Sequence, residues 1–404
     1  MPQDTGDSPL AALRVLDLAD EKAGFGARLL ADLGAEVIKV EPPGGDASRR
    51  RGPFQNNTPH PEKSLPFWYH NAGKLGITLS LESGRGRDIF MRLVRSADAV
   101  VETFPPGYLD GLGLGYSELS RQNPKIILAS ITGFGQTGPH SSYKSADIVA
   151  SAAGGQMHVS GSPATPPLKP CGQQSYYAAS LFAASGILLA RREQRRSGRG
   201  QHIDISLQEA VAATLEHVMV RYFYDKVVPT RQGNLHWTNS ACLLPCRDGY
   251  MFITFGREWE TLLELLDSEG MAADLKEARW RDGGYRRQNA SHIVDVLSAW
   301  TRTHTTGELF KMGQLMRFPW APACSLPEVC RSPQLRERRF FTPIEHPQPG
   351  RSFDYPGVPG RFSTLSWRIR GRAPSIGEHN ALVYGERLMI SEQEIKDLEA
   401  ANVI

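Results

Sequence analysis

The chain is 404 residues long and 40% of its residues are hydrophobic, which favours two domains, or one large domain with an insertion, over a disordered chain. The net charge of +3 comes from 46 basic and 43 acidic residues, so no global field would gather nucleic acid or an anionic membrane. No apolar run reaches the roughly 18 residues of a membrane span, and the amino terminus lacks the basic start of a signal peptide. We therefore expect a cytoplasmic protein that binds neither nucleic acid nor membrane. The five cysteines have no paired CxxC spacing, which predicts reduced thiols and no metal site.

Strand-like and helix-like segments alternate over the first half of the chain. Residues 13–18 predict a buried strand, residues 24–34 a helix and residues 35–41 a second strand, which is the spacing of a βαβ unit. The pattern recurs between residues 76 and 131. Such alternation predicts an α/β fold with a mostly parallel sheet covered on both faces.

Loops rich in glycine and proline follow several of these strands, where open α/β sheets place their ligands. The loop 41–54 contains Arg49 in "RRRG", which could hold an anion beside the preceding "PPGGD" or could be an exposed loop. Lys144, in the glycine-rich loop after the strand near residue 130, is a phosphate contact or a solvated lysine. Asp147, at the end of that loop, is expected to cap the next helix.

The pattern of predicted strands and helices changes near residue 225. From there to about residue 325 strands are sparser and amphipathic helices dominate, so we predict a large domain over residues 1–224 and a smaller α+β domain over residues 225–325. Residues 326–404 form a tail rich in proline and glycine. Its closing helix begins at Ser391 with Glu394 three residues on, the pattern of a capping box.

One short motif resembles a dinucleotide fingerprint. "GFGARL" at 24–29 opens a helix, and Glu41 ends the next strand where a ribose-binding acid would lie. However, Leu29 replaces the third glycine, and five residues separate the first strand from Gly24. We therefore interpret the motif as a glycine-containing helix start that packs.

Eight stretches in one order resemble the class III CoA transferases, a family that includes formyl-CoA and carnitine CoA transferases and α-methylacyl-CoA racemases. Among them are "LADLGAEVIKVEPPGGD", "NAGKLGITLSL", "PKIILASITGFGQTGP" and "SGRGQHIDISLQEA", and the likeness covers almost the whole chain. The resemblance implies a Rossmann-like large domain to which the segment 326–404 returns, a small inserted domain, and two protomers threaded through one another as an interlocked dimer. It also implies an active site that binds CoA between the protomers.

The resemblance breaks at the catalytic position. Relatives that transfer CoA use an aspartate that forms a mixed anhydride and then an aspartyl thioester. It lies ten residues before a glycine that corresponds to Gly186, and this position is Tyr176 here. A tyrosine with an ordinary pKa of about 10 is almost wholly protonated at neutral pH. Simple packing at the start of a buried helix is the plain alternative for Tyr176.

Other positions change together with this one. The histidine that racemases place before the acid corresponding to Asp147 is Ala146, and the loop after the first strand carries Glu21 and Lys22. Lys22 could activate Tyr176, or Tyr176 could act as a general acid with Glu21 as base, in an isomerase, lyase or hydrolase. Positions where relatives touch CoA are kept at three residues: Lys74, Phe104 and Lys144.

Three hypotheses follow. The favoured one is a diverged CoA-transferase-like enzyme that acts on an acyl-CoA or related acyl substrate without the aspartyl nucleophile. The second is a non-catalytic partner subunit of a hetero-oligomeric CoA transferase, and the third is a repurposed fold for a non-CoA ligand. We expect no tightly bound cofactor, coenzyme A or an acyl-CoA as substrate, and a homodimer or an assembly with a paralogous subunit.

Overall fold

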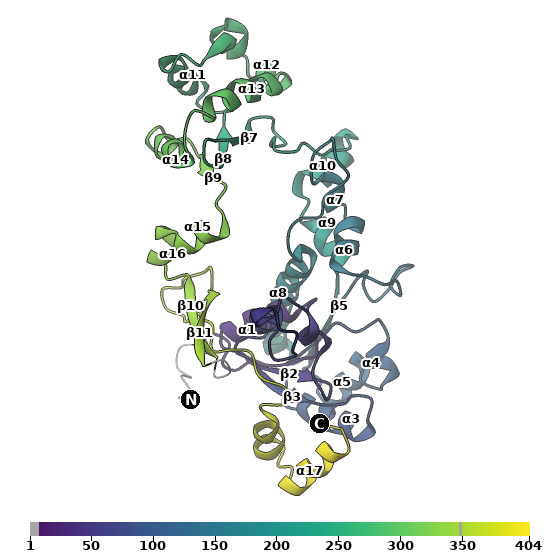
Figure 1. Cartoon of the computed structure of the whole chain (residues 1–404). Helices are drawn as coiled ribbons and strands as arrows, with labels where there is room; N and C mark the ends of the chain where they lie inside the picture. Colours follow the sequence, from purple (N-terminus) through teal and green to yellow (C-terminus); the bar gives the residue numbers. More distant parts are fainter. Residues whose placement is uncertain (1–7, 347–349) are drawn as a thin grey trace. The chain divides into compact units, whose positions relative to one another are not determined.

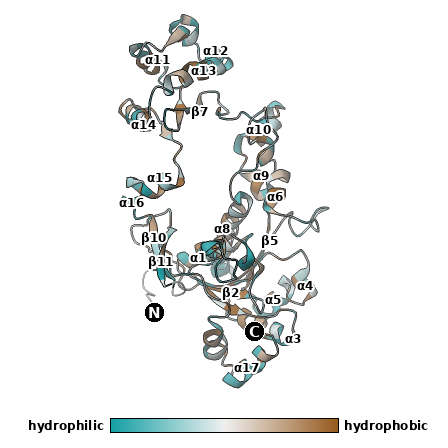
Figure 2. Ribbon diagram, in the orientation of Figure 1, coloured by the Kyte–Doolittle hydropathy of each residue, from teal (hydrophilic) through white to brown (hydrophobic). Residues whose placement is uncertain are grey.

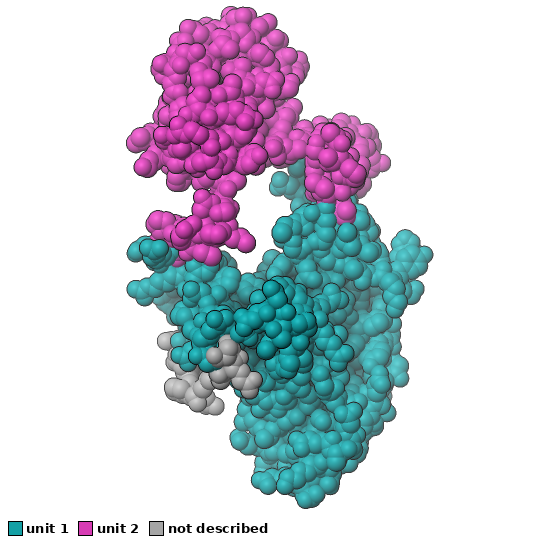
Figure 3. All heavy atoms as spheres, in the orientation of Figure 1, with its two compact units in different colours: residues 1–156, 169–219, 336–404 teal, residues 157–168, 220–335 magenta. Residues whose placement is uncertain are grey.

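The computed structural model describes residues 8–346 and 350–404 and divides into two compact units (Figure 3). The first unit comprises residues 1–156, 169–219 and 336–404, and the second comprises residues 157–168 and 220–335. The second unit thus contains the whole range 225–325 that the sequence assigns to a small domain, together with the flanking residues 220–224 and 326–335 and the separate segment 157–168. Residues 336–404 belong to the first unit, so both ends of the chain contribute to it.

A six-stranded parallel sheet forms the centre of the first unit, which confirms the α/β fold expected from the alternating segments (Figure 1). Its order is β3-β2-β1-β4-β5-β6, the order of a Rossmann-like doubly wound sheet. The strands are β1 (Arg14–Asp17), β2 (Glu36–Glu41), β3 (Leu75–Thr78), β4 (Ala99–Glu102), β5 (Ile127–Thr132) and β6 (His202–Ser206). The strand order reverses between β1 and β4, which are paired in parallel.

Helices cover both faces of this sheet because its side chains alternate between two apolar cores. The helices of the first unit are α1 (Gly24–Asp32), α2 (Leu65–His70), α3 (Gly84–Val94), α4 (Tyr108–Gly111), α5 (Tyr116–Gln122), α6 (Asp147–Ala153), α8 (Gln174–Ser197), α9 (Leu207–Ala213) and α17 (Glu392–Ala400), with shorter turns η1 (Ala47–Arg50), η2 (Gln55–Asn57) and η5 (Ala381–Arg387). Leu16 of β1 lies in the core shared with α3, α5 and α17, whereas its neighbour Val15 lies in the core shared with α1, α6 and α8. This period of two is what a strand buried on both faces requires.

Helix α1 packs closely against α8, and Gly26 makes this possible. A Cβ atom at Gly26 would lie 2.5 Å from the carbonyl oxygen of Ser180. The structure therefore supports a packing role for the glycines of "GFGARL". At the other end of the chain, the Ser391 side chain caps α17 by accepting a hydrogen bond from the Glu394 backbone, which is one of the two bonds of the capping box that the sequence predicts.

The first unit also contains an antiparallel pair, β10 (Phe341–His346) and β11 (Arg351–Pro356). In the second unit an antiparallel sheet of β7 (Ala241–Pro245), β8 (Tyr250–Thr254) and β9 (Ala321–Pro322) packs with helices around its own apolar core. These helices and turns are α11 (Trp259–Ser268), η3 (Ala273–Lys276), η4 (Ala278–Arg281), α12 (Gly283–Gln288), α13 (Ala290–Thr301) and α14 (Thr306–Leu315). Helix α15 (Leu326–Arg331) follows in the same unit and has no buried residue. Helices α7 (Gln156–Val159), α10 (Glu216–Asp225) and α16 (Pro333–Glu337) cross the boundaries of the two units in sequence. Across residues 8–346 and 350–404, every helix is too short or too polar to span a bilayer.

Candidate active site

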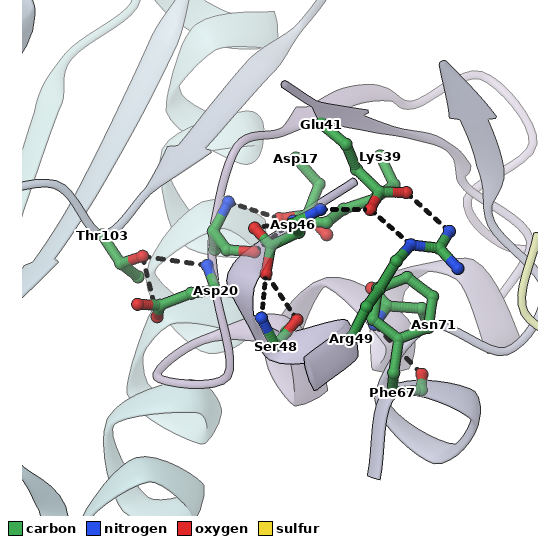
Figure 4. Close-up of polar contacts among 12 residues, drawn as sticks. Asp17, Asp20, Lys39, Glu41, Asp46, Ser48, Arg49, Phe67, Asn71 and Thr103 are labelled. Atoms are coloured by element: carbon green, nitrogen blue, oxygen red, sulfur yellow. Dashed lines mark hydrogen bonds and ion pairs between the residues drawn. The ribbon is translucent and has the colours of Figure 1, made fainter. Parts of the chain in front are cut away.

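The candidate site lies where the strand order reverses. Strand β1 ends at Asp17 and β4 at Glu102, and open α/β sheets bind ligands in the crevice outside such strand ends. The two following loops are joined by hydrogen bonds: the Asp20 amide donates to the Thr103 hydroxyl oxygen at 2.9 Å, and that hydroxyl donates to Asp20 Oδ1 at 2.9 Å (Figure 4). A cavity of about 380 Å³ adjoins the first loop. It is lined by Asp20, Glu21, Ser48, Arg51, Gly52, Pro66, Phe67, His70, Asn71 and Gln173.

Tyr176 occupies the first turn of α8 and packs in the apolar layer between α8 and the sheet, with 6% of its surface exposed. Burial raises the pKa of Tyr176 to about 12, and the negative charges of Glu21 and Asp20 add to the rise. The backbone of Asp147 acts in the opposite direction but does not cancel it. The phenol is therefore held in its neutral form.

Neither Lys22 nor Glu21, in the loop after β1, is placed to take the proton from the Tyr176 hydroxyl, because each is paired with another residue. The Lys22 ammonium pairs with Asp20 and donates a second hydrogen bond, at 3.3 Å, to the carbonyl of Thr103. Glu21 is paired with Arg51, whose Nη2 lies 2.9 Å from Glu21 Oε1, and burial raises the pKa of Glu21. Among the described residues, no hydrogen bond joins Lys22 to Tyr176. The predicted activation of Tyr176 by Lys22 is therefore not supported by a hydrogen bond between them. The catalytic roles of Tyr176, Lys22 and Glu21 stay predictions.

The acid that precedes α8 in the sequence, Asp147, is also engaged. Asp147 is the first residue of α6 rather than its cap, which is Ala146, so the expected capping role is wrong. Its carboxylate instead accepts hydrogen bonds from the Ser175 amide at 3.0 Å and the Ser175 hydroxyl at 2.6 Å, and pairs with Lys169 at 2.6 Å. Tertiary partners in the first turn of α8 and on the segment before it thus outcompete the local cap.

Two residues predicted to touch CoA are buried in ion pairs. Lys74 Nζ donates to Asp17 Oδ2 at 2.6 Å, to Asn71 Oδ1 at 2.9 Å and to the Gly24 carbonyl at 3.0 Å, and its side chain is fully buried. Arg49 contacts both carboxylate oxygens of Glu41, at 2.6 and 2.7 Å, from the loop that Figure 4 shows beside β2. In this structure both cations form buried ion pairs with acids at the ends of strands, Lys74 with Asp17 of β1 and Arg49 with Glu41 of β2.

The other two predicted contacts differ from these. Phe104 follows β4, is half-buried and stacks obliquely on Tyr108 with 4.6 Å between ring centres. Lys144 is exposed in the loop between β5 and α6. The sequence therefore identified residues around the crevice, but only Lys144 among the predicted cations is free to meet a ligand as the structure stands.

Residues that sequence reasoning missed also line the cavity. His70 Nε2 lies 3.3 Å from the Tyr177 hydroxyl, and burial lowers the pKa of His70 to about 4, so this imidazole is neutral at physiological pH. Arg51 comes from the same basic run as Arg49 and is the member that faces the cavity. No sequence signal separates Arg51 from Arg49, because the split depends on which arginine meets Glu41. Within the described ranges, no cluster of three His, Cys, Asp or Glu side chains is arranged to hold a metal ion.

Comparisons with known proteins agree with this architecture. The model of CoA-transferase family III matches residues 10–380. The subunit BbsE of succinyl-CoA:(R)-benzylsuccinate CoA-transferase from Thauera aromatica is 36% identical, with 91% of each chain covered. The beta subunit of succinyl-CoA–L-malate CoA-transferase from Chloroflexus aurantiacus is 30% identical, with 98% of each chain covered. The crystal structure of a CAIB/BAIF family protein from Brucella suis matches with a TM-score of 0.84 and 30% identity, covering 94% of this chain and 99% of that one. The chain therefore belongs to CoA-transferase family III.

Proposed function

We propose that this chain is a non-catalytic subunit of a CoA transferase that uses succinyl-CoA as donor, and that a paralogous subunit supplies the aspartate nucleophile. The observation that carries the proposal is the state of Tyr176: it is buried, neutral and without a bonded cation. Of the three hypotheses from the sequence, this geometry favours the partner subunit over the diverged enzyme.

The chemistry of CoA transfer strengthens this choice. The nucleophile first takes the acyl group as an anhydride and then carries the CoA thiolate as a thioester of its own side-chain carbonyl. A phenol could form an aryl ester in the first step, but it has no carbonyl carbon on which a thioester could form. With a pKa of about 12, Tyr176 is also a poor general acid near neutral pH, because efficient acids titrate close to the working pH.

Two further observations support an assembly of subunits. Two of the relatives described above are themselves named as subunits. In addition, helix α8 buries one face against the sheet and exposes Leu181, Phe182 and Leu189, while the adjacent α6 exposes Ile148. Figure 2 colours the ribbons of these helices by hydropathy. Large apolar side chains exposed on two helices that pack together are typical of a protein–protein interface.

The first test measures exchange of labelled succinate into succinyl-CoA. The chain alone should give no exchange, and exchange should appear when a family member that carries the aspartate is co-expressed and co-purifies with it. Tyr176→Phe and Lys22→Ala should leave the rate of the complex within about twofold. Exchange by the chain alone that is abolished in Tyr176→Phe would restore the diverged-enzyme hypothesis.

The second test addresses the assembly. Leu189→Glu places a charge on the exposed face of α8 and should prevent co-purification of the two subunits. Leu315→Glu is the matched control, because Leu315 is also an exposed leucine of a helix but lies in the second unit, away from α8 in sequence. If Leu189→Glu and Leu315→Glu co-purified with the same amount of partner subunit, the proposal that the exposed face of α8 forms the interface would be refuted.

A further inference from the structure

A second cavity, of about 660 Å³, lies wholly within the second unit. It is formed by the end of β8 with the loop that follows, the turn before β7, the start of α12 and the segment between α14 and β9. The lining residues are Thr238, Asn239, Ser240, Thr254, Phe255, Gly256, Arg257, Glu258, Gly283, Arg286, Arg287, Arg317, Phe318 and Pro319. None of them belongs to the site described above.

Four arginines converge on this cavity: Arg257, Arg286, Arg287 and Arg317. Two of their guanidinium groups lie close to Gly283: a Cβ atom at this residue would lie 3.5 Å from Arg287 Nη1 and 3.6 Å from Arg286 Nη2. These are ordinary van der Waals distances, and they show that the two guanidinium groups lie together at the start of α12.

Carboxylates act on Arg286 without bonding to it: the charges of Glu260 and Asp282 oppose the fall in its pKa that burial causes. Across residues 8–346 and 350–404, none of the four guanidinium groups forms an ion pair with an acidic side chain. Arg286 instead donates to the carbonyls of Trp280 and Arg281, at 2.7 and 3.0 Å, and stacks over Trp259 at 4.7 Å. Glu258 is the one acid among the lining residues, and it is exposed. The cavity therefore carries a positive excess that an anion would neutralise.

The backbone around the cavity is held in unusual conformations. Asn239, Glu258 and Arg317 adopt positive φ angles of 54°, 53° and 63°. Non-glycine residues in this region cost free energy and persist where the surrounding structure fixes them, often at ligand sites. Here three such residues, from three separate segments, line one cavity.

The chemistry of the lining defines the ligand. Guanidinium groups bind carboxylates and phosphates through paired hydrogen bonds, and a cavity of this volume suits a small molecule. The rings of Phe255 and Phe318 are 1% and 2% exposed, so they offer no open face on which a nucleobase could stack. We propose that the second unit binds a compact dianion, either a dicarboxylate or a phosphate group, between these four arginines.

The test uses the full chain, with succinate and inorganic phosphate as separate probes in isothermal titration calorimetry. Binding should be saturable, and the double variant Arg286→Gln/Arg317→Gln should weaken it by at least about tenfold, because each hydrogen bond to a charged group contributes substantially. Arg302→Gln is the matched control, since Arg302 is exposed on the same unit but does not line the cavity. Circular dichroism of each variant establishes that it is folded.

Each outcome decides the proposal. Selective binding of succinate identifies a dicarboxylate site, and selective binding of phosphate identifies a phosphate site. Absence of saturable binding of either probe, or equal weakening in the Arg302→Gln control, overturns the proposal. The result is independent of the exchange assay above, because it requires neither a partner subunit nor turnover.

Discussion

The buried pair of Lys74 and Asp17 gives the sharpest prediction of the structure. Both side chains are fully buried, and Lys74 makes three hydrogen bonds that a methionine could not make. In Lys74→Met, Asp17 would keep the hydrogen bond from the Ala19 amide at 3.0 Å but would lose its paired cation. Removing one partner of a buried ion pair typically costs about 3–5 kcal/mol, and we expect a loss of this size.

The double variant Asp17→Asn/Lys74→Met separates the ion pair from the packing. It removes both charges, so it should recover a large part of the loss seen in Lys74→Met alone. Lys144→Met is the control for a lysine that is exposed, and it should change the stability by less than about 0.5 kcal/mol.

Hydrogen exchange under denaturant is the suitable assay, because the two units need not unfold together. Amides of β1 and β2 report on the unit that contains the pair. If Lys74→Met weakened CoA binding but left these amides protected to within 1 kcal/mol, Lys74 would be a ligand contact and the reasoning from burial would be refuted.

Three further predictions follow from single features of the fold. Burial raises the pKa of Glu102 to about 7, so the folded state binds the extra proton and stability falls as pH rises from about 4.5 to 7, by up to about 3 kcal/mol; Glu102→Gln should flatten this dependence in unfolding measured at pH 5 and pH 8. A Cβ at Gly200 would lie 1.8 Å from the Ile126 carbonyl oxygen, so Gly200→Ala should lower the melting temperature markedly, whereas no change would mean that β6 can shift away from β5. Ser391→Ala removes the cap of α17 and should cost about 1 kcal/mol in chemical denaturation, with Ser391→Asp retaining most of the stability.

The sheet was predictable because its signals are local. The short apolar runs of β1 and β2, the glycine-containing start of α1 and the cap at Ser391 depend on residues within one or two elements of each other. The residues around the crevice were predictable as a set for a similar reason, since they follow the ends of predicted strands.

The partners of the charged residues were not predictable, because they lie far apart in the chain. Arg49 meets Glu41 eight residues away, but it also donates to the carbonyl of Pro374, which the C-terminal segment brings to it at 2.9 Å. The sequence around Asp147 has the pattern of an N-cap, yet the carboxylate of Asp147 bonds to Ser175 and Lys169, which follow a long loop later in the chain. Side-chain roles that depend on such contacts need the tertiary structure.

The distribution of compensated charge has a consequence for where anions bind. In the first unit two of the three cations that the sequence suggests for ligand contacts, Lys74 and Arg49, are already neutralised by buried carboxylates, and an incoming anion would have to displace Asp17 or Glu41 from them, whereas the third, Lys144, is exposed. Such a displacement would leave a buried carboxylate without its partner, which costs several kcal/mol. In the second unit the arginines beside Gly283 have no carboxylate to displace. A small dianion that bound the arginines of the second cavity would therefore avoid the cost of displacing a buried carboxylate, which binding to Lys74 or Arg49 would incur.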